Sequence, residues 1–161
     1  MARDPWSPVP AEIHAGASVL AVAEMPGADE TRVGRPLVGR SGNEWNAALG
    51  SAGLRRPHID LTNVVLCQPP GQASGAYSRM TKHIDRENKK RAKKDQSPWP
   101  HPSSCCRPAL LNLASRYESI LALGKTATSA IAGLSGSILT TRGGPLWVTK
   151  DWDVAKGGAR A

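Results

Sequence analysis

Apolar and polar positions divide the chain into short segments that alternate between strand and helix character. Residues 18–23 form a short apolar run followed at once by proline and glycine, which is typical of a buried parallel strand that ends in a loop. In residues 41–52 apolar side chains recur at helical spacing, which predicts a helix with Ser41 as its cap. Residues 59–67 are rich in β-branched side chains and are closed by Pro-Pro-Gly, which predicts a second strand.

The second half of the chain continues the alternation. Residues 104–117 carry leucines at helical spacing, 119–123 read as a third strand, 124–132 as a helix that opens on a glycine turn, and 146–149 as a fourth strand. Strands that alternate with helices form parallel sheets covered on both faces. We therefore predict an α/β fold, a three-layer α/β/α domain with a four-stranded parallel sheet.

Residues 72–104 break the pattern, because they hold many charges and then prolines, with almost nothing apolar to bury. We interpret them as an insertion, a mobile excursion from the core whose charged half could form a solvated helix up to Lys94. The predicted organisation is an N-terminal extension (1–17), a domain with this insertion (18–155) and a disordered tail (156–161).

Composition bounds the class of protein. The 161 residues suffice for one compact core, and no apolar run approaches the roughly 20 residues that cross a bilayer. Met1 to His14 contains no apolar stretch, so we predict no signal peptide and expect a cytoplasmic monomer. Lysine and arginine total 21 against 13 acids, and this excess favours a polyanionic partner such as DNA.

Glu24 is the first candidate for chemistry. It follows the first predicted strand, and ligands of such sheets bind at the carboxyl ends of the strands. It also opens a long loop, residues 26–42, which proline and glycine stiffen. The alternative is that Glu24 only acts as a cap or forms an ion pair with a nearby arginine such as Arg32 or Arg35.

Three ordered segments, "AEMPGADETRVGRPLVGRSGNEWNAALGSAGL", "LTNVVLCQPPG" and "LALGKTA", resemble motifs of the uracil-DNA glycosylase superfamily. They are most similar to family 4, the iron-sulfur type, whose patterns are GE-x-PG-x-x-E with a G-x-PF-x-G loop, TN-x-x-x-C-x-PPG, and a later LG-x-x-A turn. Together they cover most of residues 18–132. The resemblance implies hydrolysis of the N-glycosidic bond of uracil in DNA, a step of base excision repair that requires the base to leave the stack.

The resemblance also implies roles for individual residues. Glu24 matches the residue that orients or activates the water that attacks the sugar, and Asn63 matches the asparagine that reads the edge of the extruded uracil. Pro26 and Gly27 match positions that shape the loop against the DNA backbone, and Leu37 stands where the family stacks a phenylalanine on the base. We expect Glu24 and Asn63 to converge on one pocket. The alternative for Asn63 is an amide satisfied by backbone groups at a strand end.

The three cysteines, Cys67, Cys105 and Cys106, read as buried thiols or as metal ligands. The resemblance implies that Cys67 and one of the other two ligate a [4Fe-4S] cluster. Four thiolates are the usual complement, and the two family cysteines expected before the first strand are absent here. We therefore favour thiols without a cluster.

Other departures bear on activity. Leu37 offers no π face, which implies weaker selection of the base. The family's histidine-proline-serine motif is expected after the fourth strand and is not found there; His101-Pro102-Ser103 spells the tripeptide inside the insertion, which we interpret as coincidence. Two alternatives follow: a catalytically inactive DNA-binding module, or the N-terminal part of a larger, phage-like DNA polymerase fusion.

The insertion is strongly basic, and we predict that it binds DNA phosphates. A solvated charged helix is the alternative, because acids are interspersed. The predicted DNA-binding residues are Arg79, Lys82, Arg86, Lys89, Lys90, Arg91, Lys93 and Lys94.

Overall fold

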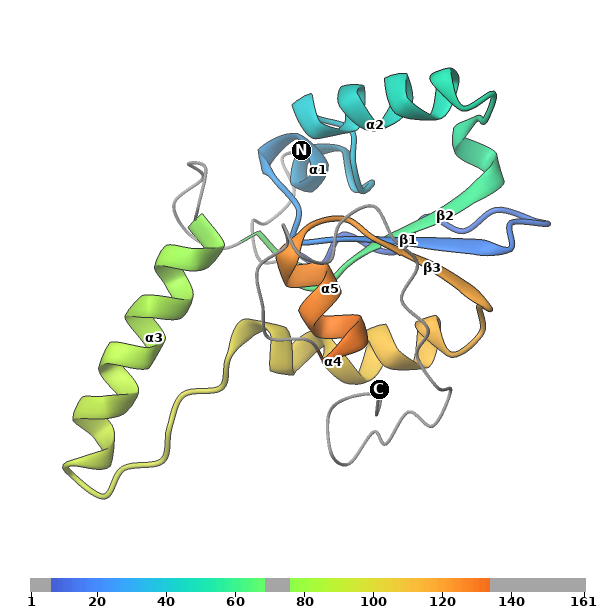
Figure 1. Cartoon of the computed structure of the whole chain (residues 1–161). Helices are drawn as coiled ribbons and strands as arrows, with labels where there is room; N and C mark the ends of the chain where they lie inside the picture. Colours follow the sequence, from blue (N-terminus) through green and yellow to red (C-terminus); the bar gives the residue numbers. More distant parts are fainter. Residues whose placement is uncertain (1–6, 69–75, 134–161) are drawn as a thin grey trace.

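The computed structural model of the chain describes residues 7–68 and 76–133 (Figure 1). Its centre is a parallel sheet in the order β2-β1-β3, formed by β1 (Val19–Ala23), β2 (Ile59–Asn63) and β3 (Ser119–Ala122). The first three predicted strands are thereby confirmed. The predicted fourth strand, residues 146–149, lies outside the described residues, so the described part of the sheet has three strands.

Helices cover both faces of the sheet, and strand alternation decides which side chains meet them. Ala21 and Leu61 point to α2 (Arg40–Ser51), where they pack with Trp45 and Leu49. Leu20, Val22 and Val64 point the other way and form the larger cluster with α4 (Pro102–Ala114) and α5 (Lys125–Ala132). Figure 1 shows the same arrangement, with α2 on one side of the sheet and α4 and α5 on the other.

Two details of the first loop differ from the sequence prediction. Residues 28–33, expected within a loop, form the short helix α1 (Ala28–Val33), which is too short to show a helical period. Helix α2 begins one residue earlier than expected, with Gly39 as its N-cap, so Ser41 lies in its first turn and is not the cap.

Strand β2 ends at Asn63, before the predicted end, and is preceded by a short 3₁₀ turn, η1 (Arg56–His58).

The charged half of the insertion forms α3 (Ala76–Ala92). Tyr77 in its first turn packs against the α4/α5 core, and the rest of the helix extends away from the sheet (Figure 1). The chain then returns along α3, where Asn88 accepts a hydrogen bond from the Trp99 amide (2.7 Å) and donates one to the Trp99 carbonyl (3.0 Å). This return path orders part of the insertion against its own helix.

Part of the predicted N-terminal extension pairs with the sheet. Glu12 and Leu61 exchange backbone hydrogen bonds of 2.8 and 2.9 Å in an antiparallel bridge, and the Val9 amide donates to the Leu66 carbonyl. Val9 is buried against the domain. These contacts cover the free edge of β2. As for membranes, none of the helices in residues 7–68 and 76–133 combines the length and apolar character that a bilayer crossing requires.

Candidate functional site at the carboxyl edge of the sheet

Glu24 lies at the carboxyl edge of the sheet, one residue beyond β1. Its Oε2 accepts a hydrogen bond of 2.7 Å from the Thr126 hydroxyl, in the first turn of α5. The two arginines named as alternative partners pair elsewhere: Arg32 with Asp29 at 3.0 Å and Arg35 with Glu12 at 2.8 Å. The half-buried Glu24 carboxylate is therefore oriented by α5.

Glu24 borders a hollow of about 490 Å³ between the sheet edge and helices α3, α4 and α5. We call it the Glu24 hollow. Its described lining is rich in hydroxyl groups and contains two cationic side chains: Glu24, Val64, Tyr77, Ser78, Thr81, Ser103, Arg107, Lys125, Thr126, Ser129 and Ala130. Ser103 belongs to the His-Pro-Ser tripeptide of the insertion, whose His101 is the N-cap of α4 and lies 3.2 Å from Asp85.

Asn63 ends β2 and pairs in register with Ala23. The residue is only 2% exposed, and its amide nitrogen Nδ2 is buried with no hydrogen-bond partner in the described part of the chain. The alternative of an amide fully satisfied by the backbone therefore does not hold for Nδ2. An unpaired buried donor costs about 1–3 kcal/mol, so its presence at the ligand-binding edge of the sheet needs an explanation.

Among the residues that the structure describes, Glu24 and Asn63 do not line the same hollow. Asn63 follows Leu61 on the side of α2, whereas Glu24 lies with Val64 on the side of α4 and α5. Asn63 is absent from the described lining of the Glu24 hollow. The expectation of one shared pocket is thus not met in the described residues, because the Ala23–Asn63 register gives the two side chains opposite parity.

Leu37 shares the α2 side with Asn63, because it packs against the cluster of Ala21, Trp45 and Leu61. Its φ of 49° lies in the left-handed region, which is uncommon for a residue other than glycine. Such strained residues persist only when their surroundings hold them.

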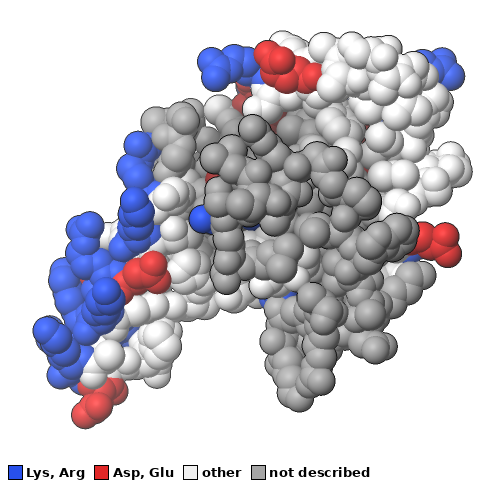
Figure 2. All heavy atoms as spheres, in the orientation of Figure 1, with Lys and Arg blue, Asp and Glu red and all other residues white. Residues whose placement is uncertain are grey.

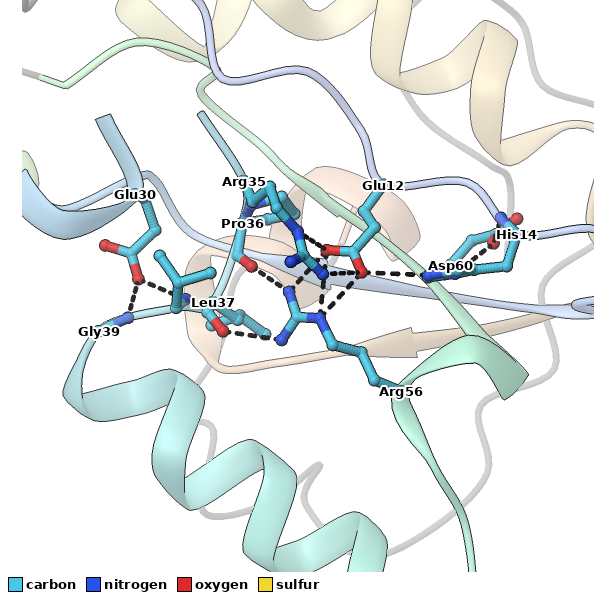
Figure 3. Close-up of polar contacts among 10 residues, drawn as sticks. Glu12, His14, Glu30, Arg35, Pro36, Leu37, Gly39, Arg56 and Asp60 are labelled. Atoms are coloured by element: carbon cyan, nitrogen blue, oxygen red, sulfur yellow. Dashed lines mark hydrogen bonds and ion pairs between the residues drawn. The ribbon is translucent and has the colours of Figure 1, made fainter. Parts of the chain in front are cut away.

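Arg56 holds Leu37 from one side (Figure 3). Its guanidinium donates to the Leu37 carbonyl at 2.8 Å and also to the Pro36 carbonyl. Glu12 in turn accepts hydrogen bonds of 2.7 to 3.1 Å from Arg56 and one of 2.8 Å from Arg35. Sequence reasoning missed Glu12 and Arg56, which are 44 residues apart and belong to no local motif.

Glu30 holds the loop from the other side (Figure 3). One carboxylate oxygen accepts hydrogen bonds from the amides of Val38 (2.9 Å) and Gly39 (2.7 Å). The other oxygen accepts a hydrogen bond from the Gly27 amide (3.0 Å). Glu30 is 8% exposed. In the sequence Glu30 is the acid of the PG-x-x-E pattern. That pattern is the sequence signal that could have indicated its role in fixing the loop.

We call the contacts of Arg56 and Glu30 with the Leu37 loop the Leu37 clamp. Glu12, which pairs with Arg56, is kept charged by its two arginine partners. Burial alone would raise the pKa of Glu12, but the hydrogen bonds and charges of Arg56 and Arg35 outweigh it and lower the pKa to about 2. A depressed carboxyl pKa stabilises the fold above the ordinary value of 4.5, and this contribution is lost as the pH falls toward 2. The clamp therefore stays intact at neutral pH.

Pro26 and Gly27 sit where the first loop leaves the sheet. Pro26 is buried, and a Cβ at Gly27 would lie 2.8 Å from Glu30 Oε2. Any larger residue at position 27 would therefore push on the carboxylate that holds Val38 and Gly39.

The three thiols alone do not supply the four ligands that an iron-sulfur cluster usually takes. Cys106 Sγ accepts the Leu66 amide at 3.4 Å, and burial together with the neighbouring Cys106 and Cys105 raises the pKa of Cys67. The three side chains thus lie in one region, with Cys105 exposed. Across the described ranges no three His, Cys, Asp or Glu residues are grouped so as to hold a metal ion, and the sequence has three cysteines where four thiolates are usual.

The predicted DNA-binding residues follow α3. The helix contains six basic residues and two acids, and Lys93 and Lys94 come directly after it. Figure 2 shows lysine and arginine side chains gathered over the surface that α3 occupies. Among the acids, Glu87 pairs with Lys90 at 2.7 Å and Asp85 with His101 at 3.2 Å. We call α3 with Lys93 and Lys94 the basic arm.

Comparison with known proteins agrees with the sequence motifs. Three curated relatives are Type-4 uracil-DNA glycosylases. The protein of Thermotoga maritima is 31% identical over 137 residues, which are 83% of this chain and 57% of that protein. The protein of Pyrobaculum aerophilum is 45% identical over 62 residues, 38% of this chain and 32% of that protein. The protein of Archaeoglobus fulgidus is 42% identical over 62 residues, 38% and 31% of the two chains.

The chain therefore spans between about a third and just over half of the length of these relatives. The family match is broader. Residues 10–155 match the family described as the uracil DNA glycosylase superfamily, and this range includes the β2-edge pairing of Glu12, the Leu37 loop, both strand-end residues and the basic arm. The chain belongs to the uracil DNA glycosylase superfamily.

Proposed function

We propose that the chain hydrolyses the N-glycosidic bond of uracil in DNA, as a monomer acting in the cytoplasm. The observation that carries the proposal is the buried Asn63 amide, whose Nδ2 has no partner among the described residues. The Watson–Crick edge of uracil carries carbonyl acceptors beside an N–H donor, and an amide can complement both. Family membership and the Type-4 relatives support the same activity.

The base would enter on the α2 side of the sheet edge, between Asn63 and Leu37. Both residues lie on that side, and Arg56 and Glu30 hold the loop that carries Leu37. Leucine packs on a pyrimidine without a π face, so discrimination rests mainly on hydrogen bonds of Asn63.

Glu24 would act on the attacking water. Its carboxylate is oriented by Thr126 and borders a space large enough for solvent and sugar. A catalytic general base must lie within hydrogen-bond reach of the proton that it accepts. With uracil on the α2 side, the sugar would cross the sheet edge toward Glu24. Asn63 and Glu24 would then act on one nucleotide from opposite sides.

Release of uracil from DNA is the direct test. Incubated with a labelled oligonucleotide that contains one uracil, the protein is expected to produce abasic sites, detected as alkali-sensitive cleavage at that position. A matched oligonucleotide with thymine in place of uracil is the control and should remain intact. Duplex binding in a gel shift without abasic sites would refute the glycosylase proposal and support the inactive DNA-binding module.

The basic arm would bind the DNA backbone, because each neutralised phosphate releases counterions. Changing Lys89, Lys90, Lys93 and Lys94 together to glutamine should flatten the slope of log affinity against log salt by up to roughly 3–4 units for duplex DNA, about 0.9 per lost contact. The matching lysine-to-arginine variant keeps the charge and should keep the slope. A glutamine variant with the wild-type slope would show that the arm does not touch phosphate.

A further inference from the structure

Arg107 lines the Glu24 hollow, and the described contacts do not account for its buried guanidinium nitrogens. It lies on α4 in the lining, and two of its guanidinium nitrogens, Nε and Nη2, are buried with no hydrogen-bond partner among residues 7–68 and 76–133. These two nitrogens form one edge of the guanidinium plane, the edge that grips two oxygens of a carboxylate or phosphate side by side. The Nε/Nη2 edge of Arg107, which can bind an anion in bidentate fashion, thus has no partner in the described residues.

Buried guanidinium donors without acceptors cost free energy of folding unless a ligand supplies the acceptors. A guanidinium does not lose its proton inside a protein, so Arg107 cannot escape the cost of burial by neutralisation. Leaving charged donors unpaired costs more than leaving neutral ones, and neighbouring side chains usually satisfy them. In the described residues Glu24 is the acid that lines the hollow, and its carboxylate is held by Thr126.

The rest of the lining suits an oxyanion. Lys125 adds a second cation, and the hydroxyls of Ser78, Thr81, Ser103 and Ser129 come from three different helices around the same space. Hydroxyl groups donate readily to phosphate oxygens, and a pair of cations offsets phosphate charge. With two cations and one acid, the described lining carries net positive charge.

We propose that the Glu24 hollow binds a phosphate group through Arg107 and Lys125. Arg107 lines the hollow, so a turn of its side chain would present the buried Nε and Nη2 to a ligand there. Resting on the proposed function, the source of this phosphate is the DNA strand that carries the extruded nucleotide: the base lies on the α2 side, and the adjoining phosphodiester lies across the sheet edge beside Glu24. Free phosphate is the other source of the same chemistry.

Thermal unfolding of the full chain tests the site without any need for turnover. In the presence of inorganic phosphate at about ten times its Kd, the wild-type Tm should rise by roughly 3–5 °C over chloride at equal ionic strength. Arg107→Met, which keeps the length and removes the charge, should lose this shift. In phosphate-free buffer the same variant should melt at or above the wild-type temperature, because it removes two buried donors that have no partner in the described part of the chain.

Arg116→Met is the matched control, because Arg116 is an exposed arginine just beyond α4 that donates to Asn112. It should retain the phosphate shift, as should the glutamine variant of the four arm lysines. A fall in the phosphate-free Tm of Arg107→Met would mean that the guanidinium is a structural cation, and it would overturn the proposal. So would a phosphate shift that survives in Arg107→Met.

Binding of a single-stranded thymine oligonucleotide separates the two sources of phosphate. If the strand supplies the phosphate, Arg107→Met should weaken binding by roughly 10- to 100-fold, and inorganic phosphate should compete. A phosphate shift that depends on Arg107, with unchanged DNA binding, would confirm the oxyanion site and reject the strand as its source. Because these probes contain no uracil, the outcome stands even if the protein releases no base.

Discussion

Asn63→Asp is expected to lower the rate of uracil release by about 10³-fold while leaving DNA binding sensitive to salt. The change keeps the shape of the side chain and replaces the amide nitrogen with a carboxylate oxygen; that nitrogen is the donor without a partner in residues 7–68 and 76–133. A carboxylate accepts only, so it faces the uracil carbonyls with like partial charge. Single-turnover rates on a uracil oligonucleotide measure the loss.

The variant has a built-in check, because the position is 2% exposed and a buried carboxyl favours its neutral form. Protonation restores a donor, so the activity of Asn63→Asp relative to wild type should rise as the pH is lowered. Asn46→Asp makes the same chemical change on the exposed face of α2 and should leave the rate unchanged. Wild-type turnover in a folded Asn63→Asp protein would remove the assigned role of Asn63.

The sheet and its covering helices were predictable because each depends on local periodicity. The strands at 19–23, 59–63 and 119–122 are short apolar or β-branched runs, and the leucines of α4 recur at helical spacing. Helix α1 escaped prediction because six residues are too few to show a period. Its acid, Glu30, caps the helix and holds the following loop at once, a role that depends on the folded loop.

The site was less predictable, because its geometry depends on register and on distant pairs. A sequence places Glu24 and Asn63 at the ends of two strands, but only the pairing of Ala23 with Asn63 shows that their side chains leave opposite faces. Likewise, Glu12 and Arg56 meet because the N-terminal segment pairs with Leu61 on the outer edge of β2. An antiparallel bridge of one residue leaves no periodic signal.

Gly42→Ala is expected to disturb the Leu37 loop more than its small size suggests. A Cβ at position 42 would lie 2.0 Å from the Leu37 carbonyl oxygen and 2.3 Å from its carbon, far inside van der Waals contact. That oxygen is the acceptor of the Arg56 hydrogen bond, so Leu37 cannot move away without losing the clamp. We expect a loss of stability of about 1–3 kcal/mol, as for overpacked cores. Displacement of Leu37 by about 1 Å should also lower kcat/KM for uracil release by roughly 10²-fold.

Gly50→Ala separates this effect from helix propensity, because Gly50 lies in the same helix and its added Cβ would meet nothing within 4 Å. Alanine favours a helix interior by roughly 1 kcal/mol over glycine, so Gly50→Ala should raise the urea midpoint while Gly42→Ala lowers it. Opposite signs from the same substitution in one helix would locate the cost in the contact with Leu37. If both variants gain stability and keep activity, α2 can shift freely against the loop, and the clamp by Arg56 and Glu30 does not fix Leu37.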